Sequence, residues 1–213
     1  MKRPPSTRGK YDRAQPAKAR KAAQREALLD SATTAIARLG FAHASVEAIV
    51  DQARMSRRTF YEHFDDLRDV LHQIHDRAAN FAFTMIETQL SAEADPLEQI
   101  RSGIRSYLGA IAANPEVAQV VFREVRAAGP EYEPRRARES ERYTGLLLRA
   151  LELAHQQGLL AFPPDETIAF AITTSVEAVA LRNLSSKNPR PVAESAEALI
   201  SLAFRAFGAR GPV

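Results

Sequence analysis

The chain has 213 residues, a formal net charge of +3 and no cysteine, which excludes disulfides and thiolate metal sites. Its length allows one large domain or two small ones with a hydrophobic core. No apolar run is long enough to cross a membrane and the first residues lack a signal-peptide block, so we expect a cytoplasmic protein. Glycine is scarce and the apolar patterns are helical throughout, which predicts an all-α fold.

Basic residues are concentrated near the N-terminus. Residues 1–64 contain 13 Lys and Arg against 6 Asp and Glu, whereas the remainder contains 16 against 20. A basic head on a weakly acidic body is typical of a nucleic-acid-binding protein. Residues 1–19 combine three prolines with scattered Lys and Arg, which predicts a disordered basic arm. Such an arm either follows DNA phosphates or only solubilises the chain, and composition leaves both open.

Residues 20–39 form the first predicted helix. Apolar residues recur there at helical spacing, and Gly40 is a typical C-terminal cap. Lys21 lies near the start of this helix, where it could meet a DNA backbone. We expect Phe41, which follows the cap, to fill a small helical core.

Residues 45–71, with the sequence SVEAIVDQARMSRRTFYEHFDDLRDVL, predict two short helices joined by a tight corner and then the start of a longer helix. Ser45 and Ser56 are placed to cap the two short helices. Phe60 and Phe64 are four residues apart, so both face the core of a second helix that we expect to run to Phe64.

The outward side chains of this second helix are types that contact bases or phosphates in a major groove: Arg57, Arg58, Thr59, Tyr61 and His63. The alternative is a helical hairpin with a solvated basic face. The order of cap, corner, cap, basic turn and inward aromatic residues favours a helix-turn-helix.

This stretch resembles the DNA-binding signature of TetR-family transcriptional regulators. The residues that carry the resemblance are Ser45, Ile49, Ala53, Ser56 and Tyr61-Glu62-His63-Phe64. Two positions depart from the family pattern: Arg54 stands at the corner, where members usually have Gly, and Leu67 stands where many have Lys. If the corner needs a left-handed backbone, Arg54 costs on the order of 1 kcal/mol relative to Gly.

The resemblance implies two domains with about nine helices in all. A three-helix helix-turn-helix domain would cover residues 20–66, and a helical effector-binding and dimerisation domain would cover residues 67–210. Residues 67–90 predict one long helix of roughly 35 Å, long enough to connect the two.

Four polar residues on this long helix have spacings that could hold a divalent metal: Asp69, His72, His75 and Asp76. The alternative is that the histidines are exposed or bond to other helices. We expect the second, and we predict neither a metal nor a cofactor.

The last two predicted helices suggest a homodimer. Residues 165–184 are apolar nearly all round, so this helix needs cover on both sides, and the helix after Pro191 has a broad apolar stripe. Either both helices are central to a monomeric body or they form a four-helix interface with a second copy. We expect the interface, formed by Ile168, Ile172, Val176, Val179, Leu199, Ala203, Phe204 and Phe207.

The resemblance also implies a small-molecule effector, bound in a mostly apolar pocket with a few polar groups. The candidate pocket residues are His75, Phe81, Met85, Arg105, Tyr107, Phe122, Arg126, Tyr143, Thr174, Glu177 and Asn183.

Three functions remain in view. The first is a ligand-responsive repressor that binds a near-palindromic operator as a dimer and is released by a small molecule. The second is a DNA-binding activator or architectural factor without small-molecule control. The third, a remote alternative, is an enzyme that uses the body's histidines and carboxylates; the sequence has no Gly-rich phosphate loop, nucleophile motif or dinucleotide fingerprint.

Overall fold

The computed structural model describes residues 14–210, and within them the fold is all helical, as predicted. The only β-type pairing in that range is an isolated bridge between Leu160 and Ala209. The helices are α1 (Ala14–Leu39), η1 (Phe41–His43), α2 (Val46–Ala53), α3 (Arg57–Tyr61), α4 (Leu67–Ala92), α5 (Pro96–Ala113), α6 (Pro115–Gln119), η2 (Val120–Glu124), α7 (Val125–Ala128), η3 (Pro130–Tyr132), α8 (Glu133–Gln156), α9 (Glu166–Ser185) and α10 (Val192–Phe207).

The first helix begins earlier than predicted. Most of the expected basic arm falls on residues 1–13, which lie outside the described residues, but residues 14–19 belong to α1. This part of the sequence is rich in alanine, the strongest helix former, and its proline lies in the first turn, where it costs no hydrogen bond. The prediction of a disordered segment up to residue 19 was therefore wrong for residues 14–19.

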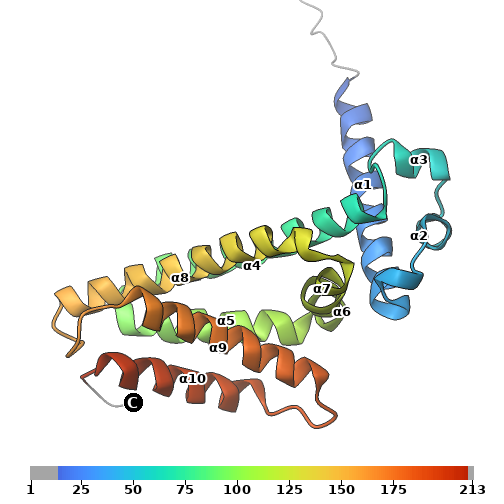
Figure 1. Cartoon of the computed structure of the whole chain (residues 1–213). Helices are drawn as coiled ribbons and strands as arrows, with labels where there is room; N and C mark the ends of the chain where they lie inside the picture. The colour runs from blue at the N-terminus through green and yellow to red at the C-terminus, as the bar shows by residue number, and fades with distance from the viewer. Residues whose placement is uncertain (1–13, 211–213) are drawn as a thin grey trace, which may run out of the picture.

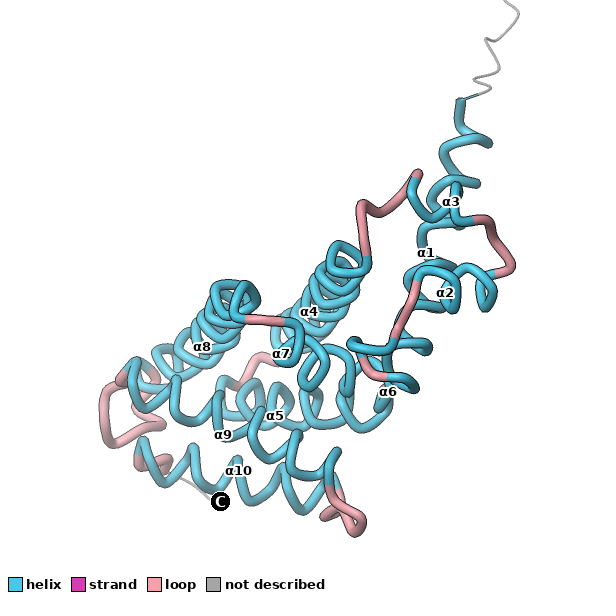
Figure 2. The backbone as a smooth tube through the Cα atoms, turned by 45° about the vertical axis from the view of Figure 1, so that its right-hand side comes forward, coloured by secondary structure: helices cyan, strands magenta, loops and turns pink. Residues whose placement is uncertain are grey.

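The helices form a head and a body joined by α4. Figure 1 shows α1, α2 and α3 at one end, with α4 leaving the head and running along the body beside α8. Helices α5, α9 and α10 complete the body. Figure 2, in which loops are pink, shows that short loops connect the helices. No helix among residues 14–210 is long and apolar enough to span a membrane.

Two hydrophobic cores correspond to the head and the body. The head core includes Ile36 of α1, Ile49 of α2 and the start of α4, all buried. The body core is built from α5, α8, α9 and α10, with Leu151 and Phe204 among its most buried side chains. In each core, several amphipathic helices bury their apolar faces against one another.

One segment of the body belongs to the head core. Helices α6, η2 and α7 run continuously from Pro115 to Ala128, with a π-helical turn at η2 in place of regular α-helix. Val120, Val125 and Tyr132 pack with the head residues, although they are far from them in sequence. We call residues 115–132 the strap. If α6, η2 and α7 are counted as one helix, the described residues contain nine α-helical segments.

Hydrogen bonds fix the strap to the end of α1 and to η1. The Glu124 carboxylate accepts from the Phe41 backbone N–H at 2.8 Å, and the Gln119 side-chain amide donates to the Ala37 carbonyl at 2.7 Å. On the other side, the Arg68 guanidinium donates to the Ala128 carbonyl at 3.1 Å. The strap therefore connects the body to both α1 and α4 of the head.

The last two helices do not present the surface predicted for them. Six of the eight predicted interface residues are buried in the protomer's own core: Ile172, Val176, Leu199, Ala203, Phe204 and Phe207. Val179 is half-buried, and only Ile168 is exposed. The reason is that α5 and α8 already cover the stripes of α9 and α10. The large apolar side chains that these two helices leave exposed are Ile168, Phe170 and Leu202.

The corner between α2 and α3 has a left-handed backbone, so the condition under which Arg54 is costly is met. Arg54 has φ 54° and ψ 44°, and it is the only residue other than glycine with positive φ among residues 14–210. The Met55 N–H donates to the Val50 carbonyl at 2.9 Å, which closes the end of α2 over this residue.

Arg54→Gly should stabilise the protein, because glycine adopts this conformation without a Cβ clash. We expect the free energy of unfolding to rise by on the order of 1 kcal/mol and the melting midpoint by about 2–4 °C, measured by circular dichroism. Gln52→Gly, at an exposed position inside α2, is the matched control and should lower stability by about 1 kcal/mol. An unchanged or lower midpoint for Arg54→Gly would show that the corner is not strained.

Glu124→Ala should destabilise the protein, because the Phe41 N–H would lose a charged acceptor in a partly buried site. The expected loss in the free energy of unfolding is about 1–3 kcal/mol, measured by urea denaturation. Arg123→Ala, at the exposed neighbouring position, should change stability by less than about 0.5 kcal/mol. Equal effects of the two substitutions would mean that the strap is not held through Glu124.

Candidate functional site

The helix-turn-helix is set by two serine caps. The Ser45 hydroxyl accepts from the Ala48 N–H at 3.2 Å, and the Ser56 hydroxyl accepts from the Thr59 N–H at 3.0 Å. Ser56 and Thr59 also join through their hydroxyls at 2.9 Å. In the free protein, these side chains therefore satisfy the first turns of α2 and α3.

The second short helix is shorter than expected. Helix α3 spans Arg57–Tyr61 and does not continue to Phe64. After α3 the chain makes a tighter turn: the His63 N–H donates to the Phe60 carbonyl, three residues earlier, at 2.9 Å. Phe60 and Phe64 are fully buried with ring centroids 5.4 Å apart, so both aromatic residues anchor the segment as predicted.

The outward surface of α3 is basic and exposed. Arg57 forms an ion pair with Glu47 of α2, and Arg58 pairs with Glu62 at 3.1 Å. A hydrogen bond to Tyr61 and the charge of Glu47 raise the pKa of Arg57 above its ordinary value. Tyr61 itself is half exposed. Because exposed ion pairs contribute little energy, both arginines can exchange their carboxylates for a nucleic acid.

His63 and Lys21 meet where the end of α3 approaches α1. Lys21 is exposed, whereas His63 is half-buried and its Nε2 has no hydrogen-bond partner among residues 14–210. Burial, and then the positive charges of Lys21 and Arg25, lower the pKa of His63. The imidazole is therefore uncharged at neutral pH, so any contact with a phosphate would be a hydrogen bond without a full charge.

The body contains an inner cavity of about 90 Å³ between α4, α5, α8 and α9. An outer cavity of about 260 Å³ lies against it, between α4, α5 and the strap. The two share Tyr107, Val121, Phe122, Glu139 and Tyr143 as lining residues. The rings of Tyr107 and Tyr143 meet edge to face, with centroids 5.2 Å apart, and form part of the partition between the cavities.

The predicted pocket residues divide into two groups. Six line one or both cavities: His75, Phe81, Tyr107, Phe122, Tyr143 and Glu177. The other five line neither: Met85, Arg105, Arg126, Thr174 and Asn183. Arg105 pairs with Glu197 at the surface, and the Asn183 amide bonds to the Ser195 hydroxyl, so both have structural partners elsewhere.

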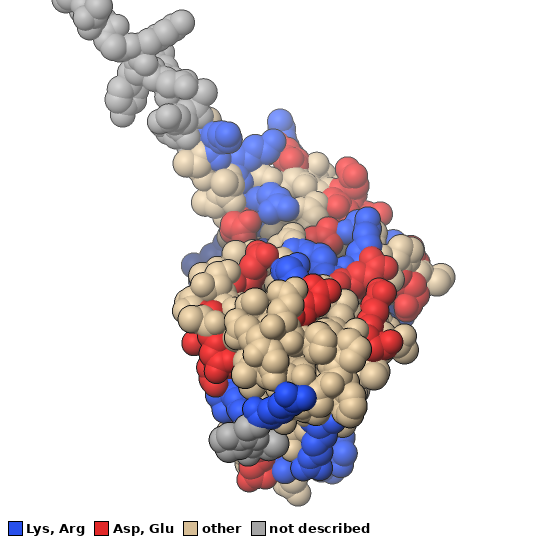
Figure 3. Space-filling view, turned by 90° about the vertical axis from the view of Figure 1, so that its left-hand side faces the viewer, with Lys and Arg blue, Asp and Glu red and all other residues tan. Residues whose placement is uncertain are grey.

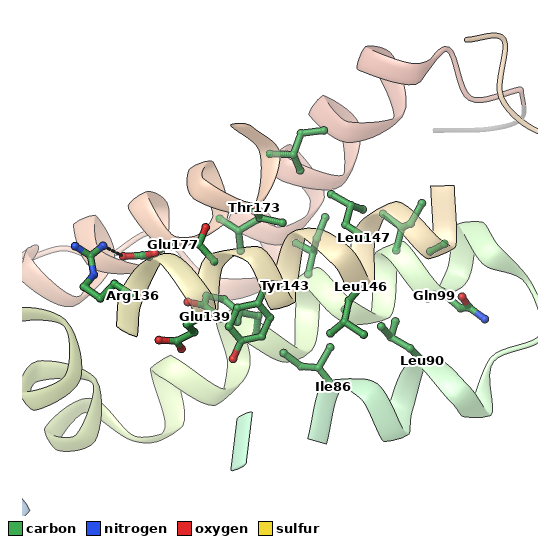
Figure 4. A pocket seen from close by; sticks show the side chains of 18 of the residues that line it. Ile86, Leu90, Gln99, Arg136, Glu139, Tyr143, Leu146, Leu147, Thr173 and Glu177 are labelled. Carbon is green, nitrogen blue, oxygen red and sulfur yellow. Dashed lines mark hydrogen bonds and ion pairs between the residues drawn. The ribbon is translucent and has the colours of Figure 1, made fainter. Parts of the chain in front are cut away.

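Two charged cavity residues were missed in the sequence. Arg136 and Glu139 lie in a run of mixed charge at the start of α8, a pattern typical of a solvated face, but both line the inner cavity. A signal was present: Arg136, Glu139 and Tyr143 are three and four residues apart, so they share one side of the helix with Leu147. Figure 4 shows Glu139 and Tyr143 close together on this side of α8.

Ion pairs and hydrogen bonds connect the polar part of the cavity. The Glu177 carboxylate accepts from both Arg136 and Arg126 at 3.1 Å. His75 is buried, with its Nε2 3.3 Å from a Glu139 carboxylate oxygen. Burial is the largest cause of the raised pKa of Tyr143, so its hydroxyl stays protonated.

The four polar residues at the start of α4 do not converge. Asp69 accepts from the Gln73 amide at 2.8 Å, and Asp76 pairs with Arg135. The ring of His72 packs against Tyr132 at a tilt of 56°, with centroids 4.6 Å apart, while Nε2 of His75 lies 3.3 Å from Glu139. Within residues 14–210 no group of three or more candidate ligands is arranged to hold a metal ion.

Two family models match separate parts of the chain. The model of bacterial regulatory proteins of the TetR family matches residues 28–74, which include the last part of α1, all of α2 and α3, and the start of α4. The model of the tetracyclin repressor-like C-terminal domain matches residues 93–181, which run from the start of α5 to near the end of α9. No curated protein matches the chain.

Solved structures share the fold at low sequence identity. A TetR-family regulatory protein from Rhodococcus RHA1 is 22% identical, with a TM-score of 0.73 over 88% of this chain and 98% of that chain. The regulator FadR from Bacillus subtilis, in complex with stearoyl-CoA, is 18% identical, with a TM-score of 0.73 over 84% and 96%. AibR, in complex with isovaleryl coenzyme A and operator DNA, is 18% identical, with a TM-score of 0.67 over 84% and 97%.

The matched family models coincide with the two parts of the molecule, the first with the capped helix-turn-helix head and the second with the helical body that encloses the cavities. The chain belongs to the TetR family of bacterial transcriptional regulators.

Proposed function

We propose that this protein is a ligand-responsive repressor that binds a near-palindromic operator as a homodimer and is released by a small molecule. The observation that carries the proposal is the exposed basic surface of α3, held on a buried pair of phenylalanines in the head. A cavity in the body, next to a strap that packs into the head core, supports the ligand response.

In this proposal, α3 enters the major groove of the operator. Arg57 and Arg58 exchange Glu47 and Glu62 for guanine edges or phosphates, since a guanidinium binds either in a bidentate manner. Tyr61 and Lys21 are exposed beside α3 and contact the backbone. The hydroxyls of Ser45, Ser56 and Thr59 mainly cap their helices, which fixes the orientation of the arginines.

The dimer interface uses the outer faces of α9 and α10. Ile168, Phe170 and Leu202 are exposed there, accompanied by exposed alanines such as Ala171 and Ala198. Small residues let two helices approach closely, and a two-fold axis through this surface would present two copies of α3 to two half-sites. Figure 3 views the body from its end, where residues without charge gather in the middle and Lys, Arg, Asp and Glu lie around them.

The effector acts through the strap. Val121 and Phe122 line the inner cavity, while Val120 and Val125 belong to the head core, so one short segment touches both. A ligand that fits only one position of the strap would favour one orientation of the head. The ligands of FadR and AibR, stearoyl-CoA and isovaleryl coenzyme A, are consistent with a molecule that has an apolar chain.

Arg57→Ala should weaken operator binding, because a base contact is lost at each half-site. We expect a cost of about 1–3 kcal/mol per contact and relaxed preference at one position of each half-site. The measurement is fluorescence anisotropy at constant salt, with operators found by mapping bound genomic DNA. Arg149→Ala, on an exposed part of α8, is the control and should leave affinity unchanged. Wild-type operator affinity for Arg57→Ala would contradict this docking.

Leu202→Glu should shift the protein from dimer to monomer, because each interface would bury two copies of an unpaired carboxylate. Sedimentation velocity at micromolar concentration would measure the change. Phe81→Glu is the matched control, since Phe81 is a more exposed apolar residue but lies on α4. If Phe81→Glu dissociated the protein and Leu202→Glu did not, the interface would not lie on α10.

A further inference from the structure

The inner cavity has an apolar end and a polar end. Ile86, Leu90, Ile100 and Leu147 line the apolar end, and Figure 4 shows Leu90 and Leu147 away from the paired Arg136 and Glu177. Gln99 also lies near Leu90, and its amide donates to the Glu93 carbonyl at 2.8 Å. An elongated ligand with a hydrocarbon chain and one polar group matches this division, because hydrocarbon is favoured only where the wall offers no unsatisfied polar atoms.

The charged groups of the wall already have partners within the protein. Glu177 is bonded to Arg136 and Arg126, each at 3.1 Å, and Glu139 lies 3.3 Å from Nε2 of His75. A ligand cation would therefore meet no free carboxylate, and a ligand anion would have to share the guanidinium of Arg136 with Glu177. An anion would also lie next to two carboxylates in a partly buried site, where repulsion between like charges is stronger than in bulk water.

The same burial and the same carboxylates also act on the phenol of Tyr107. Its pKa lies well above the ordinary value, mainly because of burial and then through Tyr143, Glu177 and Glu139. An environment that disfavours the phenolate disfavours a ligand carboxylate for the same reasons, which are loss of hydration and nearby negative charge.

Two polar atoms of the wall residues have no hydrogen-bond partner. The Tyr143 hydroxyl and Nδ1 of His75 are buried, and no residue from 14 to 210 bonds to either. The closest approach to Nδ1 is the Asp76 carboxylate at 3.6 Å, which is too long for a hydrogen bond. Buried polar atoms in folded proteins are nearly always paired, so these atoms indicate where a polar group of a ligand would bind.

We propose that the inner cavity binds an uncharged aliphatic molecule, with its hydrocarbon chain against the leucine and isoleucine end and a single hydroxyl or carbonyl group hydrogen-bonded to Tyr143. This inference deepens the proposed function and rests on it, because it assigns the chemical class of the effector. Charge disfavours free fatty acids and alkylamines, whereas alcohols, and the carbonyl of an ester or thioester, fit.

Three probes with the same eight-carbon chain separate these classes. Octan-1-ol, octanoate and octylammonium are each titrated into the full-length protein by calorimetry at pH 7.5, without DNA. We expect octan-1-ol to bind at least tenfold more tightly than either charged probe. Comparable or tighter binding of octanoate or octylammonium would overturn the proposal, as would the absence of octan-1-ol binding.

Tyr143→Phe tests the hydrogen bond itself. Loss of the hydroxyl should weaken octan-1-ol about three- to tenfold, the range expected for one neutral hydrogen bond. Since that hydroxyl has no hydrogen-bond partner among residues 14–210, the variant should keep its melting midpoint, which would show that it remains folded. Tyr61→Phe in the head is the control and should bind octan-1-ol like the wild type. Unchanged octan-1-ol affinity in Tyr143→Phe would overturn the assignment.

Glu139→Gln tests the exclusion of anions. Removal of this carboxylate should raise octanoate affinity at least threefold while octan-1-ol changes little, and no gain for octanoate would contradict the electrostatic argument. Operator affinity, measured separately with and without octan-1-ol, tests the proposed function. Binding of octan-1-ol without release of DNA would contradict ligand-controlled repression and leave the ligand class standing.

Discussion

Burial of Phe60 and Phe64 is the interaction on which the head depends. Helix α3 has five residues, far fewer than a helix needs to be stable in water, so its own hydrogen bonds cannot hold it. The two rings fix it against α1, α2 and the start of α4, and leave Arg57 and Arg58 outside. The exposed basic surface is therefore as rigid as the core beneath it.

The same core makes the head sensitive to the body. Val120 and Val125 come from the strap, so part of the cover over the head's apolar side chains is supplied by a segment that also lines the cavity. The π-helical turn of η2 lies at this position, and such turns are frequent at functional sites. A shift of the strap would change packing and the Glu124–Phe41 hydrogen bond together, which gives a ligand a physical route to α3.

Charge pairing serves opposite purposes in the two parts of the molecule. At the surface of the head, the pairs of Arg57 with Glu47 and Arg58 with Glu62 are exposed and weak, so DNA can replace the carboxylates. In the cavity wall, the pairs Glu177–Arg136 and His75–Glu139 are mostly buried and costly to break, and in our proposal they select which ligands bind. Solvent exposure, more than the residue types, separates the two behaviours.

The sequence by itself determined the local features: the caps at Ser45 and Ser56 and the inward phenylalanines. Each depends on residues within a few positions of one another, so spacing is enough to reveal it. Tertiary structure alone decided what covers each apolar face, and so whether Phe204 is core or interface and whether Glu139 meets solvent or a cavity. Periodicity identifies the apolar side of a helix, but the partner on that side comes from segments distant in the chain.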